Sequence, residues 1–124
     1  MITYKGVKCY TSKIFPPKGY TCITLISILV FRLANDEELK KYLATKNGRE
    51  CFNHERIHML QIKQLGWFKF YTYYLYFYLA YRIAGRMSHK EAYHAIPFER
   101  EAFSNEEDMD YSESHWEEYI YDEY

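Results

Sequence analysis

The spacing of hydrophobic positions changes along the chain, and each change marks a new kind of element. Over residues 2–10, β-branched and aromatic residues alternate with polar ones, which is typical of a strand. A turn signal, Pro16-Pro17-Lys18-Gly19, then precedes an apolar run of 12 residues from Tyr20 to Phe31. Because this run is too short to span a bilayer and is rich in β-branched residues, it predicts one long buried strand, paired antiparallel with the first.

From residue 35 onward the hydrophobic period is that of helices. Asn35, followed by three acidic residues, is a typical N-cap, and Asn47-Gly48 is a typical helix end, so the first helix is predicted between them. Ser88 begins a capping box for a short helix that Pro97 ends. The other helices are predicted over residues 49–65, 67–85 and 98–106. The fold class is therefore α+β and mostly helical, with the N-terminal strand pair packed on the helix over residues 49–65.

Residues 67–85 are aromatic and apolar on nearly all sides. Lys69 and Arg82 leave only 12 uncharged residues between them, whereas a transmembrane helix needs about 20. Phenol groups in the middle of the segment would also be costly in hydrocarbon. We therefore expect an aromatic core helix wrapped by the rest of the fold. A face that contacts a membrane surface, or that joins two copies of the chain as a homo-oligomer, stays open.

Length and charge indicate one domain over residues 1–124 with an uneven surface. Residues 1–105 hold all 16 Lys and Arg and 8 Asp and Glu, whereas residues 106–124 hold 9 Asp and Glu. The acidic C-terminal tail either folds back across the basic body or stays solvated, and the sequence leaves both open. The lysines are scattered rather than clustered, so no nucleic-acid partner is expected.

Cysteine use and the first residues indicate a reducing compartment. Cys9, Cys22 and Cys51 are odd in number and form no C-x-x-C pair, which argues against a disulfide framework. The residues after Met1 contain no apolar signal segment. The expected location is the cytoplasm, either free or peripheral to a membrane.

Candidate chemistry lies in the predicted helix over residues 49–65. The stretch from Asn53 to His58 contains H-E-x-x-H, which places the imidazoles of His54 and His58 on one helix face. Two such histidines can bind one metal ion, and Glu55 can then take a proton from a metal-bound water. Gln61 continues the same stripe and is a candidate polar neighbour. A third ligand must come from elsewhere, and the candidates are His89, His94, Glu99, Glu101 and His115.

A later segment, Phe98-Glu99-Arg100-Glu101-Ala102, contains the pattern E-x-x-A. H-E-x-x-H followed by E-x-x-A resembles the gluzincin metallopeptidases. The order of elements over residues 18–106 is similar to the small single-domain gluzincins and to a related group of small uncharacterised bacterial proteins. The resemblance implies a minimal zincin-like fold and a Zn²⁺ ion bound by His54, His58 and Glu99, with Glu101 as the main rival of Glu99. It also implies that Glu55 is the general base.

The chain departs from the gluzincin pattern at two points. An aspartate usually follows E-x-x-A and steadies a metal-bound histidine, but this chain has Phe103, so that role is vacant or passes to Asn105 or Glu106. The residue that stabilises the oxyanion cannot be singled out among 15 tyrosines, and Tyr93 and Tyr111 are candidates.

The motifs together predict a zinc-dependent metallohydrolase of peptidase type. A peptide or protein substrate would pair with the edge of the strand predicted from Tyr20 to Phe31. One alternative is a non-catalytic zinc-binding domain, in which the metal clamps two helices. The other is an interaction protein that places its aromatic helix on a membrane or a partner.

Overall fold

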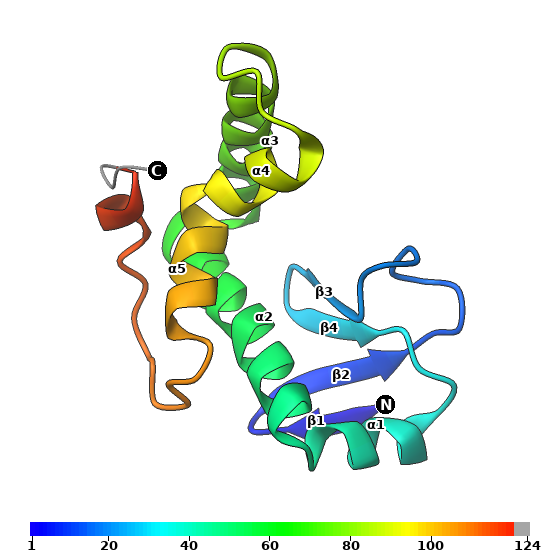
Figure 1. Cartoon of the computed structure of the whole chain (residues 1–124). Helices are drawn as coiled ribbons and strands as arrows, with labels where there is room; N and C mark the ends of the chain where they lie inside the picture. Colours follow the sequence, from blue (N-terminus) through cyan, green and yellow to red (C-terminus); the bar gives the residue numbers. More distant parts are fainter. Residues whose placement is uncertain (121–124) are drawn as a thin grey trace.

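A computed structural model describes residues 1–120 of the chain and has the predicted α+β class. Figure 1 shows an N-terminal sheet and α1 packed at one end of a long central helix, α2, with α3, α4 and α5 toward its other end. The elements are β1 (Ile2–Tyr4), β2 (Val7–Thr11), β3 (Cys22–Leu25), β4 (Ile28–Phe31), α1 (Asp36–Leu43), α2 (Lys46–Leu65), α3 (Trp67–Ile83), α4 (His89–Ala95), α5 (Pro97–Asn105) and the short 3₁₀ helix η1 (Trp116–Tyr119).

The sheet has four strands, so the prediction of two long strands was wrong. Each predicted strand is a hairpin: the first turns at Lys5 and Gly6, and the second turns at Ile26, where φ is +55°. The strand order is β1-β2-β4-β3, with β2 parallel to β4 and both outer pairs antiparallel. Ile26 gives no turn signal, because a β-branched residue rarely has a positive φ. β3 is thereby an edge strand.

The α1–α2 junction confirms one predicted boundary and corrects another. Asn35 caps α1, since its Oδ1 accepts a hydrogen bond from Glu38 N at 2.9 Å. Asn47 and Gly48 do not end α1, however; they belong to the first turn of α2, which Thr45 caps by accepting from Gly48 N at 2.9 Å. Gly48 is needed because a Cβ at this position would overlap the carbonyl oxygen of Tyr42.

The prediction that the rest of the fold wraps the aromatic helix is wrong, because most of α3 is exposed. Phe70 is its one buried residue, and Phe77 and Tyr74 on the same side are half-buried. The opposite side is exposed, and α3 and α4 stand together at one end of the molecule (Figure 1). No helix within residues 1–120 combines the length and apolar character needed to cross a membrane.

The acidic tail folds back on the body as far as residue 120, and residues 121–124 lie outside the described part. Trp116 packs against Phe98 with ring centroids 4.8 Å apart. Arg56 Nη2 donates a hydrogen bond to Tyr111 O at 2.6 Å, and Arg100 Nη1 donates to Tyr119 O at 2.8 Å. The basic side chains therefore hold the tail through its backbone carbonyls.

The buried residues form two hydrophobic clusters that share α2. One lies between the sheet, α1 and α2 and contains Leu29, Phe31, Leu39 and Phe52. The other lies between α2, α3, α5 and η1 and contains Ile62, Phe70, Phe98 and Trp116. The H-E-x-x-H motif, His54 to His58, lies on α2 between Phe52 of one cluster and Ile62 of the other, so it lies at the junction of the two clusters.

Candidate metal centre

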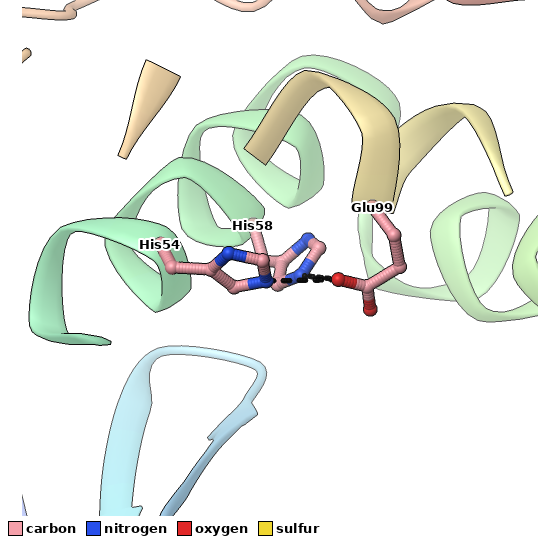
Figure 2. Close-up of side chains that lie close together, drawn as sticks. All are labelled: His54, His58 and Glu99. Atoms are coloured by element: carbon pink, nitrogen blue, oxygen red, sulfur yellow. Dashed lines mark hydrogen bonds and ion pairs between the residues drawn. The ribbon is translucent and has the colours of Figure 1, made fainter. Parts of the chain in front are cut away.

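His54, His58 and Glu99 meet at one buried point, where both imidazole rings face the Glu99 carboxylate (Figure 2). Glu99 Oε1 lies 2.8 Å from His54 Nε2 and 3.0 Å from His58 Nε2. One ligand atom from each residue lies within 4.8 Å of the other two. The structure thus brings together the three residues that the resemblance implies as zinc ligands.

Two helices position this triad. His54 and His58 lie one turn apart on α2, as the spacing predicts. α5 crosses α2 closely because Ala102, one turn after Glu99, is fully buried and small. Asn53 fixes the end of α5, since its Nδ2 donates to the carbonyl oxygens of Glu106 and Asp108 at 2.9 and 2.8 Å. Glu99 therefore reaches the imidazoles from a helix that is locked against their own.

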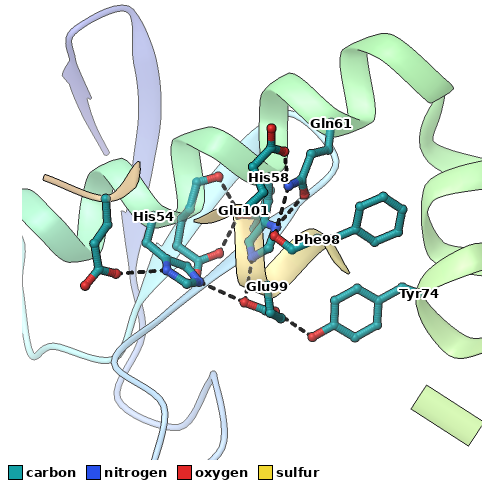
Figure 3. A network of polar contacts seen from close by, with 10 residues as sticks. His54, His58, Gln61, Tyr74, Phe98, Glu99 and Glu101 are labelled. Carbon is teal, nitrogen blue, oxygen red and sulfur yellow. Dashed lines mark hydrogen bonds and ion pairs between the residues drawn. The ribbon is translucent and has the colours of Figure 1, made fainter. Parts of the chain in front are cut away.

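Gln61 determines which nitrogen of His58 is available (Figure 3). Its Nε2 donates to Phe98 O at 3.0 Å and to Glu101 Oε1 at 2.8 Å, so its Oε1 must be the atom that faces His58. His58 Nδ1 lies 2.7 Å from that oxygen and is therefore the protonated nitrogen. The Nε2 lone pair is left for the centre. The sequence singled out Gln61 only as a polar neighbour on the same stripe.

Glu106 acts on His54 in the same way. Its Oε2 lies 3.1 Å from His54 Nδ1, which accordingly carries the proton. Of the two residues considered for the missing aspartate, Glu106 has this contact, whereas the Asn105 amide donates to Glu101 O. Phe103, which stands where the aspartate is expected, packs its ring against His54 at 4.4 Å.

This arrangement leaves two Nε2 lone pairs aimed at a carboxylate oxygen, which is unfavourable unless a positive charge lies between them. Two protons, or one divalent cation, would supply the positive charge that the two lone pairs and the carboxylate oxygen need. Burial lowers the pKa of His54, but its contacts with Glu106 and Glu99 outweigh burial and raise the pKa to about 10. Burial raises the pKa of Glu99, but the two imidazoles outweigh burial and lower the pKa to well below its usual range. Two imidazoles and one carboxylate also form the donor set of many catalytic zinc sites, so the residues fit a metal.

Glu55 lies beside the triad without joining it. Thr24 of β3 donates its hydroxyl to Glu55 Oε2 at 2.7 Å, which ties the carboxylate to the sheet. Burial raises the pKa of Glu55, although His58 and His54 oppose the shift. A half-buried carboxylate with a raised pKa is suited to hold a proton during a reaction. The role of Thr24 had no signal in the sequence, because the contact joins residues far apart in the chain.

A cavity of about 380 Å³ adjoins the triad and Glu55. Tyr74 OH, inside it, donates to Glu99 Oε2 at 2.6 Å, so this tyrosine holds the carboxylate oxygen that does not face the histidines. The cavity is lined by Tyr20, Cys22, Ile23, Thr24, Glu55, His58, Phe70, Tyr71, Tyr74, Leu75, Tyr78, His89, Tyr93 and Glu99. Most of these side chains are aromatic or aliphatic. Cys22, Ile23 and Thr24 belong to β3, so the strand edge predicted from Tyr20 to Phe31 is, beside the cavity, the shorter edge strand β3.

The other candidate ligands lie elsewhere. Glu101 is buried, but Gln61, Tyr111 OH and the backbone N–H of His115 all donate to its carboxylate. His89 lies at the mouth of the cavity, with its ring nitrogens 3.2 Å from Tyr20 OH and 2.8 Å from Tyr78 OH. His94 and His115 are exposed. Tyr111 donates its hydroxyl to Glu101. Tyr93 lines the cavity and is the remaining candidate for the residue that stabilises the oxyanion.

Comparisons with protein-family models, with curated proteins and with solved structures find no match for this chain.

Proposed function

We propose that this chain is a zinc-dependent metallohydrolase of peptidase type, in which His54, His58 and Glu99 hold the metal and Glu55 is the general base. The observation that carries the proposal is the buried triad whose two Nε2 lone pairs converge on one carboxylate oxygen. A further carboxylate, Glu55, lies in the adjoining cavity. Both features match the gluzincin pattern that the motifs resemble, although Glu106 replaces the usual aspartate.

In the proposed hydrolysis, the bound metal, Glu55 and Thr24 would each have a separate role. Zinc, when bound, lowers the pKa of a water to about 7 and polarises the scissile carbonyl. Glu55 accepts a proton from the attacking water, whose oxygen forms a bond to the carbonyl carbon. As the C–N bond breaks, Glu55 passes this proton to the leaving amine. The Thr24 hydroxyl keeps the Glu55 carboxylate in place between these transfers.

Tyr93 is the residue that we assign to the oxyanion. Burial raises the pKa of Tyr93, and Glu99 and Glu55 raise it further, so the phenol stays protonated at neutral pH. It can therefore donate a hydrogen bond to the carbonyl oxygen as negative charge develops there. Tyr74 also lines the cavity, and its hydroxyl donates to Glu99 Oε2 at 2.6 Å. An extended substrate would pair its backbone with the edge of β3.

Metal content is the first test. Purified protein should contain about one zinc per chain by plasma mass spectrometry. His54→Ala and Glu99→Ala should each lose it, and Glu37→Ala, which alters an exposed residue of α1, should retain it. Wild-type protein that stays metal-free after zinc is offered would overturn the proposal.

Glu55→Gln separates catalysis from metal binding. The amide cannot accept the proton, so we expect this variant to keep its zinc and to lose at least about 100-fold in the hydrolysis of a peptide library. Glu37→Gln is the matched control and should be as active as the wild type. Full activity in Glu55→Gln would refute the mechanism. Zinc without any hydrolysis in the wild type would instead identify a structural zinc-binding domain.

A further inference from the structure

The outer face of α3 carries an exposed hydrophobic stripe. Phe68, Leu75, Leu79 and Ile83 follow one another at intervals of seven, four and four residues, which places them on one side of the helix. Phe68 is 68% exposed and Ile83 is 73% exposed. The inner side of α3, by contrast, packs on the core through Phe70. An apolar patch of this extent on a surface marks an interaction site.

The tip of the β3–β4 hairpin extends this surface. Leu25 and Ile26 at the tip are exposed, at 38% and 47%. Tyr71 of α3 fixes the tip, because its hydroxyl accepts from Ile26 N at 3.2 Å and donates to Thr24 O at 3.1 Å. The hairpin tip and the flank of α3 are therefore held together as one apolar surface, although they lie far apart in the chain.

The segment that contains the stripe has cationic side chains and no acidic ones. Residues 57–90 contain no Asp or Glu but hold five exposed cations, namely Lys63, Lys69, Arg82, Arg86 and Lys90. Within residues 1–120, none of the five forms an ion pair with a carboxylate. At 3.6 residues per turn, Lys69 and Arg82 lie on opposite sides of the stripe. The face is thus apolar along its centre and cationic at its margins.

We propose that this face, formed by the outer side of α3 and the β3–β4 tip, binds the surface of an anionic membrane. The helix would lie in the plane of the interface with its aliphatic and Phe side chains at the acyl boundary and its cations at the lipid phosphates. Trp67 and Tyr76 of α3 are also exposed, at 55% and 65%, and such side chains favour this level of a bilayer. The proposal is independent of the metal chemistry.

Charge favours a lipid surface over a second copy of the chain. A symmetric contact through the stripe would bring the same cationic margins of both copies together. Like charges at such a contact repel each other, and no acidic residue of this segment compensates them. Anionic headgroups, in contrast, complement Lys69 and Arg82 at the margins of the stripe.

Vesicle co-sedimentation tests the proposal with the full chain. We expect binding to vesicles of equal parts phosphatidylcholine and phosphatidylglycerol, weakened by added salt, and much weaker binding to phosphatidylcholine alone. Ile83→Glu should lower the affinity at least about tenfold. The matched control is Ile14→Glu, which places the same change at another exposed isoleucine outside α3, 83% exposed, and should bind as the wild type does. Lys69→Gln should lower the affinity about fivefold.

Three outcomes would overturn the proposal. The first is the absence of binding to anionic vesicles by protein whose circular dichroism shows it to be folded. The second is an equal effect of Ile83→Glu and Ile14→Glu. The third is a dimer in sedimentation velocity without lipid that Ile83→Glu abolishes while vesicle binding is unchanged, since the stripe would then join two copies. None of these outcomes bears on metal content, so this proposal and the proposed function can fail separately.

Discussion

Single side chains outside the H-E-x-x-H motif determine the chemistry of the two histidines. Gln61 and Glu106 each accept from an Nδ1 and leave the Nε2 lone pair for the centre. Because a histidine held in one tautomer and orientation is a better ligand than a rotating one, such partners commonly contribute about 10–100-fold to metal affinity. Gln61 is the more informative of the two, because its amide also links α2 to Phe98 and Glu101 of α5.

Gln61→Met keeps the size of this side chain but removes its hydrogen bonds. We expect the affinity for zinc to fall about 10–100-fold, measured by competition with a zinc indicator on folded protein. Gln64→Met, one turn further along α2 at an exposed position, should leave the affinity unchanged. Equal affinities in the two variants would mean that Gln61 does not orient His58.

The sequence could predict the residues whose spacing within one helix carries the signal. His54 and His58 were predictable in this way, and Glu99 followed from the resemblance. Thr24 and Tyr74 could not be predicted, because each contacts the centre from an element whose position depends on the whole fold. Tyr74 is also one of 15 tyrosines, so its type alone gives no signal.

At the scale of elements, the strands and the first helix boundary show where local patterns mislead. The apolar run up to Phe31 continues through the turn at Ile26 with no Gly, Pro or Asn, so alternation alone could not reveal the hairpin. Asn47-Gly48 has the composition of a helix end, but the glycine is required by the close carbonyl of Tyr42 rather than by a positive φ. Capping by Thr45 was the signal that would have placed the start of α2 correctly.

Gly48→Ala tests this account of the α1–α2 junction. A methyl group at position 48 would overlap the backbone carbonyl of Tyr42, which a flexible side-chain movement cannot relieve. We expect the free energy of unfolding in urea to fall by about 1–3 kcal/mol. Asn47→Ala, the neighbouring exposed position in the same turn, should be neutral or slightly stabilising, because alanine favours a helix more than asparagine does. A neutral Gly48→Ala would show that the junction can open without cost.

On the scale of the whole molecule, α2 joins a sheet cluster and a helix cluster that otherwise share few elements. The triad lies at this junction, and Glu99 is 41 residues from His58 and 45 residues from His54 along the chain. In the structure, α5 is held to α2 at this point by contacts between the two imidazoles and the Glu99 carboxylate. A bound metal would replace them with a link between the two helices that the unfolded chain lacks.

Zinc should therefore stabilise the entire fold. At a free zinc concentration about 100 times the Kd, binding to the native state alone contributes about 2.7 kcal/mol, which raises the melting temperature on the order of 10 °C. Differential scanning fluorimetry of metal-free protein with and without zinc measures this shift. Calcium is the control ion and should give no shift, since it prefers sites with six or more oxygen ligands. Glu99→Gln should abolish most of the zinc shift while leaving the cavity the same size. A shift that persists in Glu99→Gln would place the stabilising zinc at other residues, and the triad would then have no part in it.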